Sequence, residues 1–355
     1  MEIIRNQPLA PLTTFGTGGQ AQFFYNPNSK EELVDKISEL KKPLWFLGYG
    51  SNVLISDKGL PGTVLKLAFN KIEMTEENDS WIFTADAGAS WDSLVRQSLN
   101  HNAWGIELMS GIPGGIGGAV AGNIAAYGQA VSDTLLWVEV IDTNAAPAKI
   151  IRLNKEQLGL TYRNSDFQNN KLAGCVILNA CFKLSKSNKK NLEYSSALKV
   201  ADELCLDPQS LHDRRKIIME SRRRAGSLLE DNGKIIKTAG SFFKNPIVEE
   251  AVAKEIIKQE ENNKDLAKVI AQNKIHGGNS TRVSAAHVLL AAGFKRGQSW
   301  GPVRLHPEHV LKIENTGGAS SQQIYDVAQE IMQRVKEILN ISLEPEVKFL
   351  GEFIK

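Results

Sequence analysis

The sequence predicts an α+β protein of three regions, the first of which is completed by the end of the chain. Three observations indicate this fold class. A helical pattern alternates with short apolar strands over roughly the first 70 residues, strand patterns dominate residues 71–185, and helical patterns dominate most of the remainder. A strand-like tail follows the last helix, and we expect this tail to return to an earlier sheet.

The first region contains one helix between strands. Ser29 and Glu32 have the spacing of a capping box, apolar residues follow at helical spacing, and Pro43 ends the helix. The apolar helix positions are Leu33, Val34, Ile37 and Leu40. Residues 44–47 and 64–67 are short apolar runs, which predict buried strands.

Strand patterns fill the second region and helices fill the third. Strands are expected at 81–84, 136–141, 150–153 and 176–178, with helices at 91–99, 211–224, 249–260 and 284–292. The clearest helix has apolar residues at intervals of three and four after Gly317-Gly318, with Ser320 or Ser321 as its cap. Those residues are Ile324, Val327, Ile331, Val335 and Ile338. The tail covers 343–353, and the Lys- and Asn-rich stretches 185–191 and 261–264 indicate solvated loops.

The expected domain bounds follow from this pattern. Residues 1–70 with 339–355 form one domain, residues 71–225 the second and residues 226–338 the third. A length of 355 residues suits two or three domains.

Composition excludes several classes of protein. Lys plus Arg number 42 against 40 Asp plus Glu, so neither a nucleic-acid nor a membrane-surface partner is expected. Three cysteines without metal spacing exclude a disulfide scaffold and fit a reducing compartment. The N-terminus has no long apolar stretch of a signal peptide, and no apolar run of 18 residues predicts membrane insertion. We therefore expect a cytoplasmic protein.

A first glycine-rich segment follows a predicted strand. Gly48-Tyr49-Gly50-Ser51-Asn52 offers backbone N–H groups that could approach a pyrophosphate. It lacks the Rossmann pattern, because Val53 takes the place of the third glycine and a strand follows. Taken alone, the segment fits a plain tight turn better than a ligand loop.

A second glycine-rich segment is less ordinary. It runs from Ser110 to Asn123 and continues to Gly128, with seven glycines, small apolar residues and almost no charge. This composition favours a loop packed around a large ligand over a structural turn or a flexible linker. Two such loops without a Walker lysine or a Rossmann pattern indicate a dinucleotide, and flavin is the natural candidate.

Two further motifs are weaker. Ser241-Phe242-Phe243-Lys244 matches the S-x-x-K of penicillin-binding proteins. Near-matches to the companion motifs S-D-N and K-T-G occur at 165–167 and 237–239, but both precede Ser241, which is the wrong order. Asn245-Pro246 also follows Lys244 where the helix of that family should continue. His306 and His309 have no accompanying cysteine or acidic ligands, so a polar loop is preferred to a metal site.

Six segments together resemble the UDP-N-acetylenolpyruvoylglucosamine reductases, and they occur in the order of that family from residue 12 to 347. They are Leu12-Thr13-Thr14-Phe15 with Gly18-Gly19, Gly48-x-Gly50-Ser51-Asn52-x-Leu54, Ile112-Pro113-Gly114 to Gly128, Tyr162-Arg163-x-Ser165-x-Phe167, Ala239 to Pro246, and Leu343-Glu344-Pro345-Glu346-Val347. Each is modest evidence alone, but six in order are specific.

The resemblance implies a fold and an activity. The fold is a two-part FAD-binding region of the vanillyl-alcohol-oxidase type plus a third α+β substrate-binding domain. The activity is reduction of UDP-N-acetyl-3-O-(1-carboxyvinyl)-glucosamine to UDP-N-acetylmuramate in peptidoglycan precursor synthesis. Non-covalent FAD and NADPH are the implied cofactors, the enolpyruvyl ether of a UDP-sugar is the partner, and no obligate protein partner is evident.

The resemblance also implies site residues. Ser241 would be the proton donor, with Arg163 and Glu346 as further catalytic residues. The implied cofactor contacts are Gly48, Gly50, Ser51, Asn52, Leu54, Ser110, Ile112, Pro113, Gly114, Gly117, Gly118 and Asn123. The implied substrate contacts are Tyr127, Tyr162, Tyr194, Lys244 and Asn245, with Tyr194 resembling the tyrosine of the longer family type. Ala225 stands where many members carry a lysine, which leaves the diphosphate contact open.

The chemistry of an enol ether explains these residue types. Hydride addition to the vinyl carbon develops negative charge on the neighbouring carbon and its carboxylate, which Arg163 could stabilise with two parallel hydrogen bonds. Glu346 could donate to the same carboxylate if it is protonated, and Ser241 could protonate the strongly basic carbon. The alternatives are another FAD oxidoreductase of this fold acting on a sugar or hydroxy acid, and a flavin- or nucleotide-binding regulator without turnover.

Overall fold

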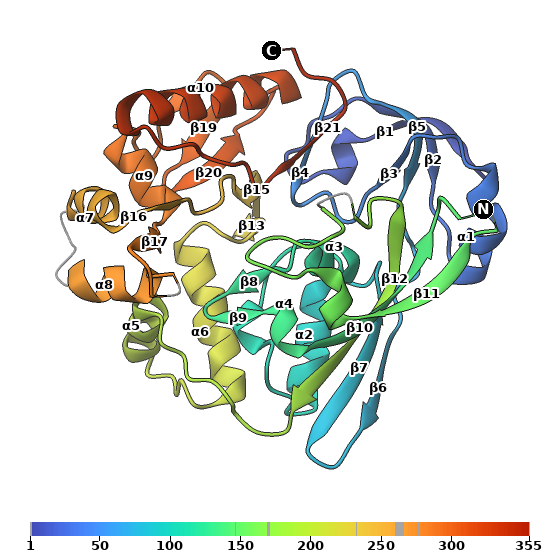
Figure 1. Cartoon of the computed structure of the whole chain (residues 1–355), viewed down its shortest axis with the longest axis horizontal. Helices are drawn as coiled ribbons and strands as arrows, with labels where there is room; N and C mark the ends of the chain where they lie inside the picture. Colours follow the sequence, from blue (N-terminus) through green and yellow to red (C-terminus); the bar gives the residue numbers. More distant parts are fainter. Residues whose placement is uncertain are drawn as a thin grey trace. The chain divides into compact units, whose positions relative to one another are not determined.

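The computed structural model describes residues 2–145, 147–168, 171–231, 233–259, 266–275 and 277–354. The chain forms two compact units (Figure 1). Unit 1 comprises residues up to Pro8 with 20–50 and 60–228, and unit 2 comprises 9–19, 51–59 and the chain from residue 229. Each unit combines helices with sheets, which is the predicted α+β class. The bounds of the three predicted domains stay a prediction.

The first sheet of unit 1 has the strand order β1-β2-β5-β3. Its strands are β1 (Ile4–Pro8), β2 (Gln20–Tyr25), β5 (Leu60–Leu65) and β3 (Leu44–Phe46). The helix α1 (Lys30–Lys36) joins β2 to β3, and the Ser29 hydroxyl caps it by accepting from the N–H of Glu32 at 3.1 Å. The predicted buried strand at 44–47 is wrong for Phe46, which is 37% exposed because β3 lies at the sheet edge.

The second sheet of unit 1 is antiparallel throughout, in the order β11-β10-β12-β7-β6. Its strands are β6 (Ile72–Glu76), β7 (Ser80–Asp86), β10 (Leu135–Asp142), β11 (Lys149–Asn154) and β12 (Cys175–Ser185). The remaining elements are α2 (Trp91–Asn100), η3 (Glu107–Met109), α3 (Ile116–Ala121), β8 (Ala125–Ala126), β9 (Gln129–Ala130), α4 (Val131–Thr134), η4 (Lys155–Leu158), α5 (Ser195–Leu204) and α6 (Leu211–Arg224), with η2 (Ile37–Glu39) after α1. Trp91 of α2 packs edge-on to Phe182 of β12, so this helix shares the core of the sheet.

The main sheet of unit 2 has the order β15-β20-β19-β18. Its strands are β15 (Lys237–Ser241), β18 (Ser299–Trp300), β19 (Val303–His306) and β20 (His309–Asn315). The other elements are η1 (Ala10–Leu12), β4 (Val53–Ile55), β13 (Glu230–Asp231), β14 (Lys234–Ile235), β16 (Ile247–Glu249), α7 (Glu250–Lys258), α8 (Leu266–Asn273), β17 (Ser280–Arg282), α9 (Ala285–Ala291), α10 (Ser321–Leu339) and β21 (Lys348–Leu350). The predicted loop at 261–264 lies outside the described residues.

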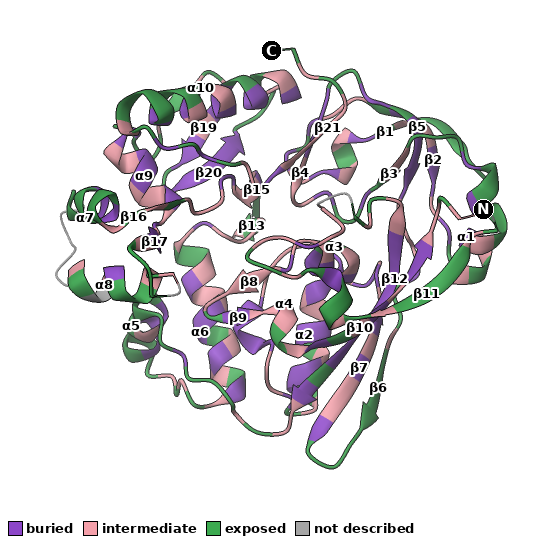
Figure 2. Ribbon diagram, viewed as in Figure 1, coloured by how far each residue is buried: buried purple, intermediate pink, exposed green. Residues whose placement is uncertain are grey.

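Helix α10 confirms the clearest sequence pattern. Ser320 caps it by accepting from the N–H of Gln323 at 3.1 Å, and Ile324 and Ile331 are fully buried. The buried stripe faces the body of unit 2 (Figure 2). Ile338 departs from the pattern and is 53% exposed. It lies in the last turn, where the next residue, Leu339, packs against the core in its place.

The tail returns to an early strand, as predicted. Within unit 2, β21 pairs in parallel with β4, with Lys348 opposite Val53 and Leu350 opposite Ile55. The carboxylate of Asp57, two residues after β4, accepts from the backbone N–H groups of Ser321 and Gln322 at 2.9 Å each. An anionic side chain at these unpaired donors stabilises the start of α10.

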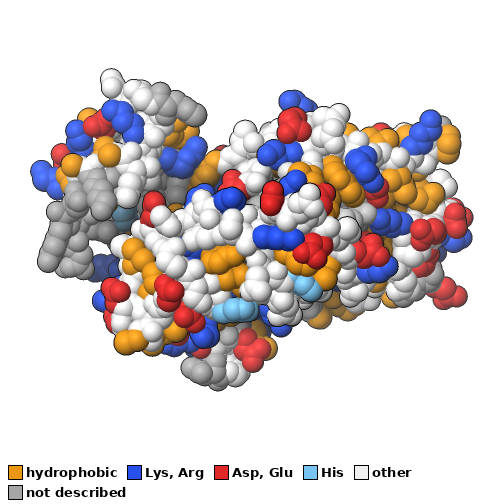
Figure 3. Space-filling view, turned by 90° about the horizontal axis from the view of Figure 1, so that it is seen from below, with side chains coloured by type: hydrophobic (Ala, Val, Ile, Leu, Met, Phe, Trp, Pro, Cys, Tyr) orange, Lys and Arg blue, Asp and Glu red, His pale blue; other side chains and the backbone are white. Residues whose placement is uncertain are grey.

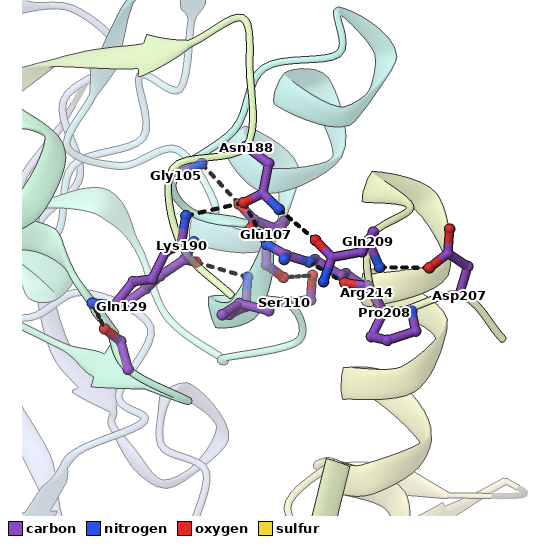
Figure 4. A network of polar contacts seen from close by, with 12 residues as sticks. Gly105, Glu107, Ser110, Gln129, Asn188, Lys190, Asp207, Pro208, Gln209 and Arg214 are labelled. Carbon is purple, nitrogen blue, oxygen red and sulfur yellow. Dashed lines mark hydrogen bonds and ion pairs between the residues drawn. The ribbon is translucent and has the colours of Figure 1, made fainter. Parts of the chain in front are cut away.

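A buried ion pair fixes α6 to η3 in unit 1 (Figure 4). Arg214 is fully buried and donates from Nη1 to Oε1 of Glu107 at 2.8 Å. Its Nε donates to the carbonyl of Pro208 at 2.7 Å, and its guanidinium lies over the ring of Trp104. Oε2 of Glu107 accepts from the N–H of Gly105 at 2.8 Å. Both members of the pair therefore make further hydrogen bonds, while Nη2 of Arg214 is buried without a partner among the described residues.

The surface of the described chain shows no single-sign patch on the face drawn in Figure 3, where basic and acidic side chains are interspersed. Cys175, Cys181 and Cys205 are all free thiols. Among the helices of the described residues, none combines the length and apolarity needed to span a bilayer.

Replacing Glu107 by Ala should lower the free energy of unfolding by about 3–5 kcal/mol, because it leaves the Arg214 guanidinium buried without its counter-ion. Urea denaturation followed by tryptophan fluorescence measures the change. The matched control is Glu39→Ala, which breaks an exposed pair with Lys36 and should change stability by less than about 1 kcal/mol. Equal effects of the two substitutions would contradict the structural role of the buried pair.

Candidate active site

The long glycine-rich segment lies along the residues that follow β7. The N–H groups of Ile116 and Gly117 donate to the carbonyls of Ala89 and Ala87, and the N–H of Trp91 donates to the carbonyl of Gly114. A Cβ at Gly117 would stand 3.1 Å from the Cβ of Ala87. Gly117 is therefore needed for the close packing of α3 within unit 1.

Gly118 differs from Gly117 in what surrounds it. Among the described residues, no atom other than those of the chain neighbours and the backbone of α3 lies within 4 Å of the position that a Cβ would take at Gly118. The N–H groups of Ile112, Gly114 and Gly118 donate no hydrogen bond among the described residues. Gly114 also has a φ of +137°, which side-chain-bearing residues rarely adopt. This part of the loop offers unpaired donors and room, as a ligand loop should.

The two glycine-rich segments meet in unit 1. A Cβ at Gly115 would lie 3.1 Å from the ring of Tyr49, and the Tyr49 hydroxyl donates to the carbonyl of Gly88 at 3.3 Å. Nζ of Lys66 donates to the carbonyl of Gly48 at 2.6 Å and lies over the Tyr49 ring. Tyr49 was not among the predicted site residues. The sequence signal that could have identified it is its place between Gly48 and Gly50 of the predicted turn.

Arg163 sits in a tight turn that is held against the end of α3. Thr161 and Asn164 exchange backbone hydrogen bonds around it, and Arg163 has a φ of +52°. The Asn123 side chain donates to the carbonyl of Thr161 at 2.8 Å, and the Ser165 hydroxyl donates to the carbonyl of Ala121 at 2.6 Å. These contacts place Arg163 at the C-terminal side of the glycine-rich segment.

The predicted substrate tyrosines form a pair in unit 1. The rings of Tyr127 and Tyr194 lie edge-on with centroids 5.4 Å apart, and Tyr194 is 50% exposed. Lys190, in the loop before Tyr194, donates to the carbonyl of Gly128 and lies 3.7 Å from the Asp133 carboxylate. Loop 185–191 is thus anchored near the tyrosine pair rather than simply solvated. Tyr162 is 38% exposed.

Arg222 is a site candidate that sequence reasoning left unassigned. Its Nη2 donates to the carbonyl of Ser227 at 2.9 Å, its Nε is buried without a partner among the described residues, and that Nε lies 3.4 Å from the Cβ position of Gly111. Burial lowers the pKa of Arg222, while Tyr127 raises it and Arg163 lowers it. A second guanidinium therefore accompanies Arg163 beside the glycine-rich loop.

Unit 2 brings Ser241 and Glu346 onto adjacent backbone segments. The N–H of Glu346 donates to the carbonyl of Phe242 at 2.8 Å, and Phe243 forms a bridge with Pro345. The Asn52 amide donates to the carbonyl of Glu346 at 3.1 Å. Ser241 ends β15 and is partly exposed. Because Ser241 ends a strand and opens no helix, the S-x-x-K interpretation is wrong.

Lys244 lies at the same end of unit 2. Its Nζ donates to the Glu344 carboxylate at 2.6 Å, with 14% of the lysine side chain exposed. Burial and the charge of Lys244 lower the pKa of Lys348, whereas Glu344 and Glu346 raise it. These alternating charges surround the backbone that carries Glu346.

Four of the predicted contact residues use their side chains within the protein. The Ser110 hydroxyl donates to the carbonyl of Glu107 at 2.6 Å, and Leu54 is fully buried in the core of unit 2. Asn123 bonds to Thr161 and Ser132, and Oδ1 of Asn245 accepts from the N–H of Ala285 at the start of α9. Ligand contacts of these residues remain predictions.

No metal site accompanies these residues. Among the described residues, no three His, Cys, Asp or Glu side chains are grouped as metal ligands would be. Nδ1 of His306 accepts from the N–H of Glu308 at 3.1 Å, and Nδ1 of His309 accepts from the N–H of Leu311. Both histidines therefore belong to the turn between β19 and β20.

The residues fit a flavin dinucleotide. Unpaired N–H groups in a glycine-rich loop suit a pyrophosphate, and a buried guanidinium beside that loop suits an electron-rich ring. Residues 21–149 match the family "FAD binding domain". Fold and site together define an FAD-binding flavoprotein.

Comparison with known proteins identifies the family. Residues 228–350 match the family "UDP-N-acetylenolpyruvoylglucosamine reductase, C-terminal domain". The reductase of that name from Thermobifida fusca (strain YX) is 31% identical over 98% of both chains, and that from Salmonella typhimurium is 29% identical over 97% of this chain and 95% of its own. This chain belongs to the UDP-N-acetylenolpyruvoylglucosamine reductase family, whose members are FAD-dependent oxidoreductases.

A solved structure supports the fold. The crystal structure of the reductase from Thermus caldophilus has a TM-score of 0.64 and 24% sequence identity, covering 99% of this chain and 98% of its own. The similarity therefore extends over both units. It confirms the α+β fold class that the sequence predicts.

We expect the purified protein to be yellow, with about one non-covalent FAD per chain, because the loops offer donors but the described site holds no covalent anchor. Heat release and chromatography identify the flavin. A colourless protein that takes up no added FAD would exclude this assignment.

Gly118→Val should reduce FAD binding with little change in stability, because its side chain enters the space beside the unpaired N–H groups. Gly117→Val is the matched comparison, since that side chain meets Ala87 and should destabilise the fold by about 1–3 kcal/mol. Flavin absorbance per chain and urea denaturation measure the two effects separately. If Gly118→Val binds FAD normally, this part of the loop does not contact the cofactor.

Proposed function

We propose that the chain reduces UDP-N-acetyl-3-O-(1-carboxyvinyl)-glucosamine to UDP-N-acetylmuramate with NADPH, in peptidoglycan precursor synthesis. The observation that carries this function is the 31% identity to the Thermobifida fusca reductase across 98% of both chains. FAD held by the glycine-rich segments of unit 1 would supply the hydride chemistry that the reduction of the enol double bond needs, with NADPH as the source of electrons. The steps below concern the protein's own groups.

Ser241 is the proposed proton donor. Hydride addition at the vinyl carbon leaves a strongly basic carbon that must gain a proton. Ser241 lies at the end of β15 and is partly exposed, so its hydroxyl is accessible to the substrate. Serine is a weak acid, but the basicity of the carbon makes the transfer favourable when the donor is held in reach.

Arg163 and Glu346 are proposed to stabilise the substrate carboxylate. A guanidinium can bind a carboxylate through two parallel hydrogen bonds, and this interaction strengthens as negative charge grows. The fixed turn around Arg163 limits the entropy lost when the substrate binds. Glu346 would donate to the same carboxylate as a neutral acid, and its backbone is held by Phe242 and Asn52.

The remaining substrate contacts follow the predicted set. Tyr194 and Tyr127 offer an aromatic pair for the nucleotide part, of which Tyr194 is exposed, and Tyr162 lies in the Arg163 turn. Lys244 is proposed as a phosphate contact or an orienting cation, and Asn245 as a further polar contact. Arg222 is a candidate for binding a negatively charged group of the cofactor or substrate, because Ala225 carries no charge.

We also place the enzyme in the cytoplasm without an obligate protein partner. The three free thiols favour a reducing compartment. The runner-up activity, oxidation of a sugar or hydroxy acid by the same fold, is disfavoured by the full-length match to reductases. A non-catalytic regulator would bind flavin but would not consume NADPH in the presence of the UDP-sugar.

Ser241→Ala should leave flavin reduction by NADPH nearly intact, because that half-reaction needs no proton from Ser241. Reoxidation of the reduced protein by the UDP-enolpyruvyl sugar should slow by at least the ~10²–10⁴-fold of lost general acid catalysis. Stopped-flow absorbance at the flavin band separates the two half-reactions.

Ser241→Cys is the matched control, because a thiol of similar size is another proton donor and should restore part of the rate. Slow reduction by NADPH together with normal reoxidation in Ser241→Ala would show that Ser241 is not the donor.

A further inference from the structure

One face of the main sheet of unit 2 carries polar and charged side chains although it is buried. Side chains alternate between the two faces of a strand. Leu311 and Ile313 of β20 lie on one face and belong to the apolar core. Lys312 and Glu314 lie on the other face and are 2% and 4% exposed. Burying such groups is costly unless they are paired or used.

Lys312 lies directly opposite Ser241. The two residues are partners in the antiparallel pairing of β15 with β20. The N–H of Phe242 donates to the carbonyl of Leu311 at 2.8 Å, which makes 242 and 311 a hydrogen-bonded pair. The adjacent pair, Ser241 and Lys312, is therefore non-hydrogen-bonded, and side chains of such pairs lie closest together.

Glu314 and two histidines also lie on or beside this face. Glu314 accepts from Nε of Arg304 at 2.8 Å. Burial and then Lys312 lower the pKa of His306, with Glu314 and Glu308 raising it and Arg304 lowering it further. Burial lowers the pKa of His309 to about 4, with the charges of Lys312, Arg296 and His306 acting in the same direction. Both histidines are neutral at pH 7.

We propose that Lys312 is a positioning and proton-supplying residue for Ser241. Its ammonium group stabilises the serine oxygen as the hydroxyl gives its proton to the substrate carbon, and it then returns a proton to that oxygen. With His306 and His309 neutral, Lys312 is a transferable positive charge on this face, directly opposite Ser241 in the strand pairing. The proposal rests on the proposed role of Ser241 as proton donor.

The proton balance is simple. The Ser241 O–H bond breaks as a C–H bond forms on the substrate, which leaves an alkoxide. One N–H bond of the Lys312 ammonium then breaks as the serine O–H bond forms again, leaving a neutral amine. Water reprotonates that amine before the next turnover. Lysine suits this role and arginine does not, because arginine keeps its proton in proteins.

The test compares Lys312→Met, Lys312→Arg and the control Lys295→Met, whose lysine is exposed in the loop after α9. Reoxidation of the reduced holoenzyme by the UDP-enolpyruvyl sugar should be about tenfold or more slower in Lys312→Met. Reduction by NADPH should stay within about twofold, since general acid catalysis is absent there. Lys312→Arg should be intermediate, because it keeps the charge but cannot give up the proton. Lys295→Met should match the wild type.

A double substitution distinguishes action through Ser241 from an independent effect. If Lys312 acts through the serine, Ser241→Ala with Lys312→Met should be no slower in reoxidation than Ser241→Ala alone. If Lys312→Met does not fold, Lys312→Gln takes its place in every comparison.

Three results would overturn the inference. They are normal reoxidation in the Lys312 variants, equal slowing of both half-reactions, and additive losses in the double variant. Normal reoxidation in Ser241→Ala would instead overturn the proposed role of Ser241. A slow Ser241→Ala with a normal Lys312→Met would leave Ser241 as the donor and remove only Lys312.

Discussion

Helix α6 is held to η3 and α2, which precede the glycine-rich segment of unit 1, by two ion pairs on successive residues, and the placement of that segment depends on them. Arg214 meets Glu107 in the interior, and Arg215 binds both oxygens of Asp92 at 2.7 and 2.9 Å. The same Asp92 carboxylate accepts from the N–H of Gly111 at 2.7 Å. A continuous series of polar contacts thus links Arg215 of α6, through Asp92, to Gly111 of the glycine-rich segment.

The same helix carries Arg222 two turns beyond Arg214. Residues eight apart differ by about 80° around an α-helix, so the two arginines lie on the same broad side of α6. The buried pair therefore sets the rotation of α6, and that rotation brings the Arg222 guanidinium beside Gly111. The position of the Arg222 cation beside the loop therefore follows from packing in the interior. The position of Arg163 depends on different hydrogen bonds, which involve Ala121 and Asn123.

The sequence predicted regular elements well where local chemistry specifies them. Helix α6 was expected at 211–224 and is observed at Leu211–Arg224, and the Ser29 and Ser320 caps are both formed. Helix α5 was missed because Tyr194 precedes it without a side-chain capping bond. The exposure of Phe46 could not be foreseen, because a strand's position within its sheet depends on distant partners.

The candidate site was predictable as a set of residues but not as a geometry. Motifs named Arg163, Ser241 and Glu346, yet the burial of Arg214 and Lys312 has no signal in a sequence, where charged residues indicate a solvated surface. The difference between the surroundings of Gly117 and those of Gly118 also has no signal in the sequence. Two adjacent glycines look alike until a neighbour such as Ala87 is placed beside one of them.

The interleaving of the two units limits how this protein can be divided. The part that matches the reductase C-terminal domain begins at residue 228, but unit 2 also needs residues 9–19 and 51–59. A fragment starting at 228 would lack β4, the pairing partner of β21, and Asp57, the cap of α10. The C-terminal half is therefore no independent module, and a gene fusion or exchange at that boundary would transfer an incomplete core.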